Sequence, residues 1–368
     1  GLSNHDLLWY RAPWPPEEAV RRAGLLPLDK PFRTAFQYQS TMFTAAGLAV
    51  QSAGGMKWED FVRSRLLVPL GMKRTTFTST EALKSKDIAC GCGLDGDGKP
   101  IPMQRYPLAH PEPAGSIHSS ARDLATWLRF QLNEGTIDGR RIVSAENLGE
   151  THRPQMVIRL ERADRATHPE TVQMSYGLAW VIQDYRGKKL VSHAGIIDGI
   201  RCHLTMAPAE KIGIVVLANL HRTRLNQALS NTLVDLLLDL PAKDWNKILM
   251  KVANQEIADF NEFARQREAA RHHNTKRSLD LGNYTGAYEH PAYGTIHLLV
   301  NKDQLVWNLH GIQATLEHYE FDTFVLPIGF LGQPFVRFKL TTARAVQSMV
   351  IDGVVNAELK RTEKPGRW

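Results

Sequence analysis

The sequence predicts an α+β protein, in which an antiparallel sheet is flanked by helices with a helical subdomain and is followed by a small all-β barrel domain. Apolar residues recur with the 3.6-residue period of helices before and after a group of short strands at 176–220. From residue 278 onward, short β-like runs are separated by Gly, Asn and Asp. The 368 residues are enough for two or three such domains.

Two helices are predicted in the first part of the chain. Apolar residues at 42–50 follow a helical period, and the pair Gly54 and Gly55 ends the pattern. A second stripe, at 58–66, is expected to break at Pro69, because proline lacks the N–H that a helix interior needs.

Two further helices precede and follow the strands. Ser120 with Asp123 three residues later forms a capping-box pattern, which opens a helix that closes at Gly135. The leucine-rich period at 225–237 predicts a helix that ends before Pro241.

The strands between these helices differ in pattern. Residues 189–193 form a short strand, and 200–206 alternate apolar and polar side chains, as expected for a half-buried strand. After a turn at 208–211, residues 212–217 are almost continuously apolar, which indicates a central strand of the sheet.

The composition changes after residue 240. Residues 246–273 have a polar, helical pattern, and β-like runs follow at 295–300, 304–309, 323–326 and 336–340. We expect three parts: an N-terminally incomplete hydrolase-type domain at 1–240, a helical linker at 241–277 and a β-barrel domain at 278–368.

Charge and hydropathy exclude several classes of protein. Hydrophobic residues make up 43% and charged residues 23% of the chain, which excludes disorder of the whole. The net charge of +7 comes from scattered Lys and Arg without a run of five, so we expect no nucleic-acid partner. The longest apolar runs, such as 212–220, fall short of the roughly 18 residues of a membrane span, so no transmembrane segment is expected.

The three cysteines do not indicate a disulfide framework or a zinc site. Cys90 and Cys92 are too close for an unstrained bridge and lack a nearby His, and Cys202 lies in an apolar alternation typical of a core strand. The sequence also lacks a glycine-rich dinucleotide motif, a P-loop, a G-x-S-x-G elbow and an H-E-x-x-H motif. We therefore expect no cofactor and no bound metal.

Two short segments remain that could carry chemistry. The first contains Tyr38 and Ser40 at a helix start, and the second contains His193, Ala194 and Gly195 at a strand end. Taken singly, Tyr38 is better interpreted as a core aromatic residue, and His193 as a strand-end histidine bonded to the backbone.

Taken together with three other segments, these residues resemble the serine β-lactamase-like hydrolases, the group of class C β-lactamases, penicillin-binding proteins and D-aminopeptidase-type esterases. Residues 69–75 are similar to the family pattern P-L-G-M-x-x-T, 114–125 to A-G-G-L-x-S-T-A-x-D-L-A, and 176–180 to Y-G-L-G-W. The resemblance covers about residues 1–240. The region 278–366 is similar to a lipocalin-like barrel that some members carry.

The resemblance implies roles for five residues. Tyr38 matches the Tyr of the Tyr-x-Asn element, a base or proton relay, and Ser40 takes the place of its Asn. His193 takes the Lys position of Lys-Thr-Gly and faces the cleft, where Gly195 lets substrate lie against the strand. The backbone N–H of Ile196 would be one oxyanion donor.

One departure from the family pattern is serious. No Ser in this sequence has Lys three positions later, so the family's nucleophilic Ser-x-x-Lys pair is missing. We expect it in a segment that precedes this chain or in a separate polypeptide. With it, the protein would be a serine hydrolase that forms an acyl-enzyme with an ester, a small amide or a D-amino-acid-containing peptide. Without it, the protein would be an inactive binding or scaffolding protein that retains the cleft. The expected partner is a small-molecule or short-peptide substrate, and assembly into a homo-oligomer is left open.

Overall fold

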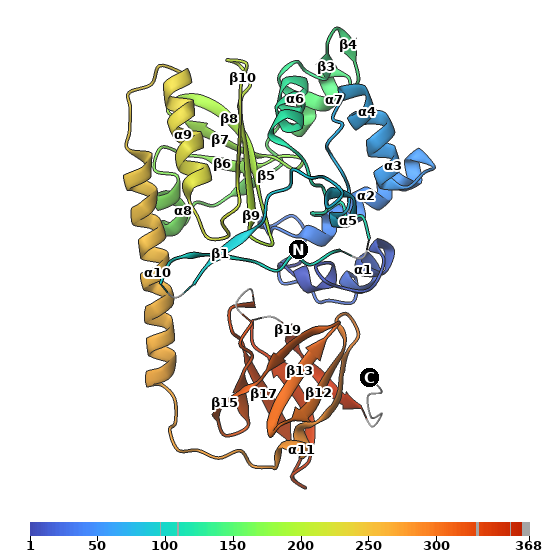
Figure 1. The fold of residues 1–368 in the computed structure, drawn as a ribbon, viewed down its shortest axis with the longest axis vertical. Coiled ribbons are helices and arrows are strands. Elements are labelled where there is room, and N and C mark those ends of the chain that lie inside the picture. The colour runs from blue at the N-terminus through green and yellow to red at the C-terminus, as the bar shows by residue number, and fades with distance from the viewer. Residues whose placement is uncertain (96, 109, 329–330, 354, 363–368) are drawn as a thin grey trace. The chain divides into compact units, whose positions relative to one another are not determined.

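The computed structural model describes residues 1–95, 97–108, 110–328, 331–353 and 355–362. It confirms the predicted α+β class with a C-terminal β-barrel (Figure 1). The chain divides into two compact units: Gly1–Asn4 with Leu28–Asp259, and His5–Pro27 with the residues from Phe260 onward. An N-terminal segment thus groups with the barrel, although it precedes Tyr38 in the sequence.

A six-stranded antiparallel sheet organises the first unit, with strand order β10-β9-β8-β7-β6-β5. Its strands are β5 (Met156–Ile158), β6 (Met174–Tyr176), β7 (Val181–Tyr185), β8 (Lys188–Ile197), β9 (Ile200–Ala207) and β10 (Ile212–Ala218). Figure 1 shows α6 (Ala121–Leu132) on one side of this sheet and α9 (Leu225–Leu237) with α10 (Trp245–Ala269) on the other.

Strand β10 corrects one prediction, because it is the outermost strand of the sheet and not a central one. Its apolar character comes from cover on both faces. Gly213 lies against Leu128 and Leu132 of α6, while Ile214 packs in the cluster on the α9 side. An edge strand between two helix layers carries the same apolar pattern as a central strand.

Two apolar clusters hold the layers together. On the α6 face, strand residues pack with helix residues in a cluster of Leu128, Leu132, Trp180, Ile182, Val191 and Met206. On the opposite face, α9 and the start of α10 pack on the sheet in a cluster that includes Tyr185, Leu190, Ala207, Val216, Val234 and Trp245. Neighbouring residues such as Leu190 and Val191 belong to opposite clusters, as the alternation of a strand requires.

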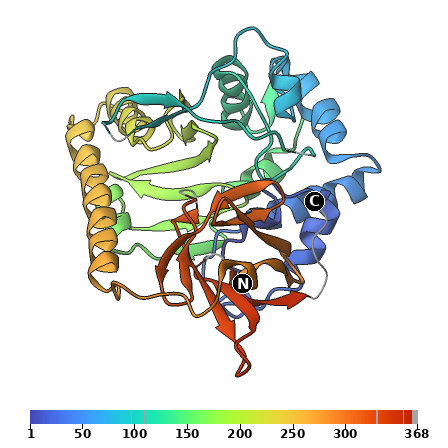
Figure 2. The ribbon, with the colours of Figure 1, turned by 60° about the horizontal axis from the view of Figure 1, so that its bottom comes forward.

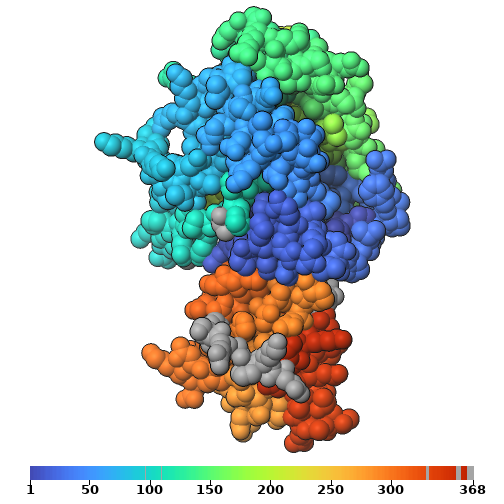
Figure 3. Space-filling view, turned by 90° about the vertical axis from the view of Figure 1, so that its right-hand side faces the viewer, coloured from blue at the N-terminus to red at the C-terminus, as the bar shows by residue number. Residues whose placement is uncertain are grey.

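The helical subdomain contains α2 (Ser40–Gly54), α3 (Trp58–Val62), α4 (Val68–Leu70), α5 (Ser79–Ala82) and α7 (Ala145–Thr151). Gly55, at φ +65°, ends α2 as predicted. The helical backbone ends at Leu70, one residue past the predicted break at Pro69, where Gly71 adopts φ +69°. A π-helical turn at Arg63–Leu67 comes just before Pro69, and such a turn accommodates a residue without an N–H to donate. Residues 67–77 pack with Phe130, Ile137 and Leu148 in one apolar cluster. In the space-filling view the blue surface of the early helices adjoins the green surface of later segments (Figure 3).

Two of the family-like segments meet at the start of α6. The Ser120 hydroxyl accepts a hydrogen bond from the Asp123 N–H at 3.2 Å, which confirms the predicted cap. The buried Asp123 carboxylate accepts from the N–H of Arg74 and the hydroxyl of Thr75, both at 2.8 Å. Asp123 therefore anchors residues 69–75 to α6.

Shorter elements complete the first unit and the N-terminal segment: η1 (Asp6–Leu8), α1 (Pro16–Ala23), β1 (Cys92–Leu94), β2 (Pro100–Pro102), β3 (Thr136–Ile137), β4 (Arg140–Arg141) and α8 (Arg162–Thr167). Helix α10 covers most of the predicted helical stretch and ends at Ala269. Within the described residues, none of the helices combines the length and hydropathy needed to span a bilayer.

The second unit contains a nearly closed nine-stranded antiparallel barrel, the orange and red strands of Figure 2. Its order is β14-β13-β12-β11-β19-β18-β17-β16-β15. The elements are α11 (Leu281–Tyr284), β11 (Gly286–His290), β12 (Gly294–Asn301), β13 (Gln304–Leu309), β14 (Ile312–Thr315), β15 (Glu317–Glu320), β16 (Thr323–Val325), β17 (Phe335–Leu340), β18 (Val346–Ile351) and β19 (Val355–Thr362). Mutually packed aromatic rings, Tyr284, Tyr288, Phe324 and Phe338, occupy its interior.

Candidate active site

Tyr38 lies in the irregular segment that leads into α2. Gln39 caps this helix, because its side-chain oxygen accepts the N–H of Thr41 at 3.0 Å. Ser40 is the first residue of α2 and is only 5% exposed, whereas Tyr38 is 39% exposed. Of the two residues in this motif, Tyr38 is therefore the one open to solvent.

Strand β8 carries His193, Gly195 and Ile196. It pairs with β9 as far as Ile197, but its register with β7 ends at Ser192. The last five residues of β8 therefore extend past the end of β7.

The turn after β8 determines which way its backbone groups point. Asp198 and Gly199 have φ of +45° and +83°, the conformation of a type I′ hairpin turn. Such a turn is closed by a hydrogen-bonded pair, here Ile197 with Ile200, and every second residue repeats the bonding to β9. The backbone N–H and C=O of Ile196 consequently point away from β9, toward the side where β7 has ended.

Three rings from different segments meet beside this strand. The Tyr176 hydroxyl lies 2.9 Å from Nε2 of His193. The Tyr38 ring centroid is 6.2 Å from the rings of both His193 and Tyr176, tilted by 37° and edge-on at 84° respectively. Phe36 packs on Tyr176 at 5.2 Å. Tyr38 and His193, predicted from separate motifs, are thus brought together.

Burial favours the neutral forms of His193 and Tyr176. It lowers the pKa of His193, an effect that a hydrogen bond to the Ala194 backbone opposes. It raises the pKa of Tyr176, and the nearby Tyr38 raises it further. Behind the cluster, burial lowers the pKa of His203 to about 4, with smaller contributions from His168 and His193.

Gly195 lies directly opposite Cys202 on β9. A Cβ at position 195 would come within 2.8 Å of the Cys202 sulfur, so glycine is the residue that fits without displacing its neighbour. The burial of Cys202 raises the pKa of its thiol and keeps it protonated.

Tyr176 is the residue of this cluster to which sequence analysis assigned no role. The motif at 176–180 is visible in the sequence, but nothing in it indicates that the tyrosine hydroxyl contacts His193. Strand β6, which ends at Tyr176, is separated from β8 by β7. Tyr176 can therefore reach His193 only because β8 continues past Ser192, the last residue that it pairs with β7.

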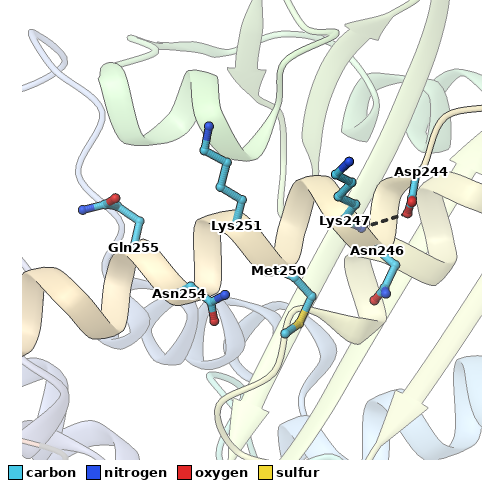
Figure 4. A pocket seen from close by; sticks show the side chains of 7 residues that line it. All are labelled: Asp244, Asn246, Lys247, Met250, Lys251, Asn254 and Gln255. Atoms are coloured by element: carbon cyan, nitrogen blue, oxygen red, sulfur yellow. Dashed lines mark hydrogen bonds between the residues drawn. The ribbon is translucent and has the colours of Figure 1, made fainter.

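No group of three or more His, Cys, Asp or Glu side chains in the described part of the chain could hold a metal ion. A shallow groove follows the first turns of α10 (Figure 4), lined by Asp244, Asn246, Lys247, Met250, Lys251, Asn254 and Gln255. Its lining contains none of the predicted site residues.

Curated relatives with similar sequences include hydrolases. An unguisins hydrolase of Aspergillus campestris is 28% identical over 304 residues, which are 78% of this chain and 53% of that protein. An unguisins hydrolase of Aspergillus violaceofuscus is 26% identical over 352 residues, 86% of this chain and 60% of that protein. The chain therefore spans little more than half the length of these relatives.

A similar solved structure and two family models complete the comparison. The octameric penicillin-binding protein homologue from Pyrococcus abyssi superposes with a TM-score of 0.55 at 21% identity, covering 96% of this chain and 74% of that chain. A model of a domain of unknown function, DUF3471, matches residues 270–366. The Beta-lactamase family model matches residues 1–238, and this chain belongs to that family.

Proposed function

We propose that this chain is part of a serine hydrolase, which forms an acyl-enzyme with an ester, a small amide or a D-amino-acid-containing peptide. Membership of the Beta-lactamase family and the relatives named as hydrolases support hydrolytic chemistry. The observation that carries the proposal is the contact of Tyr38 with His193, beside the part of β8 that extends past β7.

Each residue has a proposed role that follows from its position. Tyr38, exposed and packed against His193, serves as base or proton relay. The Ile196 N–H, directed past the end of β7, is an oxyanion donor, since a backbone N–H held in a sheet needs no reorganisation. Gly195 leaves room for substrate along the strand. Ser40, the first residue of α2, takes the place of the Asn in the family's Tyr-x-Asn element, where it would hydrogen-bond the Lys or the substrate amide.

The proposed nucleophile is a Ser-x-x-Lys pair that lies outside the sequence of this chain. A serine and a lysine three residues apart share one helix face, so the lysine can activate the hydroxyl. No such pair exists among the 368 residues. The same fact favours a second candidate, a binding or scaffolding protein that retains the cleft without acyl transfer.

The neutral imidazole favours substrates without a carboxylate beside the scissile bond. Lysine at this position of the family pattern carries a positive charge, whereas burial lowers the pKa of His193 and leaves it uncharged at pH 7. A neutral ring offers a β-lactam carboxylate one hydrogen bond without the charge assistance that makes such contacts strong. We therefore place β-lactam hydrolysis below ester and amide hydrolysis.

The test begins with the protein isolated from its source. Denaturing intact mass shows whether Ser-x-x-Lys accompanies residues 1–368, and a serine-directed phosphonate then reports an activated serine. We expect labelling, and turnover of ester or D-amino-acid amide substrates.

Tyr38→Phe should lower kcat by about 10²-fold or more, as loss of a proton-transfer group does. Tyr185→Phe, a buried tyrosine bonded to Asp235, is the matched control. A species of 41.4 kDa that resists the probe would favour the binding protein.

We further propose the domain limits 1–240 and 278–368, with 241–277 as linker, and a lipocalin-like architecture for the barrel. The ranges matched by the two family models, 1–238 and 270–366, support these limits.

We also propose that the protein forms a homo-oligomer. Light scattering of the purified protein measures its molar mass in solution and so tests this directly.

A further inference from the structure

Tyr176 contacts both residues on which the proposed function depends. Its hydroxyl is 2.9 Å from His193 Nε2, and its ring meets the Tyr38 ring edge-on at 6.2 Å. Phe36 packs against it at 5.2 Å and limits its rotation. Tyr176 is therefore held between the two proposed site residues by contacts on more than one side.

The protons in this cluster have a defined arrangement. Burial raises the pKa of Tyr176 above its ordinary value of 10, so its hydroxyl keeps its proton and can donate. A neutral imidazole has one N–H and one acceptor nitrogen. The Tyr176 hydroxyl lies at Nε2. The hydrogen bond to the Ala194 backbone raises the pKa of His193, as a ring N–H that donates to a carbonyl does, and with Nε2 facing Tyr176 this N–H is assigned to Nδ1. In that arrangement Nε2 accepts from the Tyr176 O–H.

We propose that Tyr176 is a positioning residue of the active site, whose O–H fixes His193 in the Nδ1–H tautomer and holds its ring against Tyr38. The inference rests on the proposed function for its catalytic meaning, but the tautomer itself is a property of the folded chain. His193 Nε2 is occupied by Tyr176, so this nitrogen does not take a proton from substrate. Proton transfer is left to Tyr38.

The tautomer is read by NMR on the full chain with ¹⁵N-labelled histidine. His193→Gln identifies the His193 signals by their loss. We expect wild type to show a protonated Nδ1 and an unprotonated Nε2 at pH 7.5. Tyr176→Phe keeps the ring packing and removes the donor, so the signals should shift toward the Nε2–H form. Tyr185→Phe is the matched control, because its hydroxyl donates at 2.7 Å to Asp235 and not to His193.

Activity provides the second readout. Tyr176→Phe should lower kcat/KM about tenfold, the cost of leaving one buried hydrogen-bonding group unpaired. An Nε2–H tautomer in wild type, or spectra of Tyr176→Phe that match wild type, would overturn the inference. Failure of the phosphonate probe with the Nδ1–H tautomer present would instead refute the proposed hydrolase and leave the positioning contact intact.

Discussion

Asp235 offers a stringent test of how the layers of the first unit are joined. It lies on α9 at 3% exposure and accepts hydrogen bonds from the Tyr185 hydroxyl at 2.7 Å and from Trp245 Nε1 at 2.7 Å. Arg186 pairs with it at 2.9 Å. One carboxylate thus connects strand β7, helix α9 and the first residue of α10.

The substitution Asp235→Asn keeps the shape and removes the charge. Tyr185 and Arg186 approach Oδ1, whereas Trp245 approaches Oδ2. An asparagine oxygen in the Oδ1 position leaves its NH₂ facing the indole N–H, so one buried donor is unsatisfied at about 1–3 kcal/mol. Arg186 keeps Glu170 at 3.8 Å but loses its nearer charged partner, which adds about 1.5–3 kcal/mol. We expect the free energy of unfolding to fall by about 3–5 kcal/mol.

Urea denaturation followed by tryptophan fluorescence measures this change, because Trp245 itself is buried in the affected cluster. The control is Asp138→Asn, an exposed carboxylate that pairs with Arg129 at 3.1 Å. Its removal should change stability by less than about 0.5 kcal/mol. An Asp235→Asn variant within 1 kcal/mol of wild type, at an unchanged slope, would refute the reasoning about the buried network.

Two other predictions concern the site and its surroundings. Gly195→Ala places a Cβ 2.8 Å from the Cys202 sulfur and should cost about 1–3 kcal/mol in urea unfolding, and Cys202→Ala should recover part of it; additive effects of the two changes would contradict the contact. Burial lowers the pKa of both His152 and His203 to about 4, so the unfolded chain binds more protons than the folded chain below pH 6.5. Stability should therefore be full above pH 6.5 and fall toward pH 4, by about 2–3 kcal/mol for each histidine. Equal urea midpoints at pH 7.5 and 5 would exclude this linkage.

Local patterns in the sequence determined most of the elements. Glycine at 55 ends α2 in the left-handed conformation, and Ser120 caps α6, because caps involve residues within one turn. Strand β9 and helix α9 also lie where the periodicity predicted them. The motifs around Tyr38 and His193 were likewise visible in the sequence, because each is a short contiguous string.

Neighbour relations were decided by the tertiary structure. Strand β10 is apolar on both faces because helices cover it above and below, and that pattern carries no information about its lateral partners. Pro69 is tolerated near the end of a helical run because a π-helical turn precedes it and Gly71 ends the run two residues later. The apolar pattern of β10 shows only that the strand is buried, and the proline shows only that an N–H is missing. The position of the strand in the sheet and the end of the helix depend on the packing around them.

The same distinction applies to the candidate site. The sequence alone supplied Tyr38 and His193 as separate candidates, but it gave no role to Tyr176, which joins them. A hydrogen bond between side chains of β6 and β8 requires β7 between them to end first, at Val181 opposite Ser192. Strand length and register are properties of the assembled sheet, and for that reason only the tertiary structure determines which groups meet Tyr38.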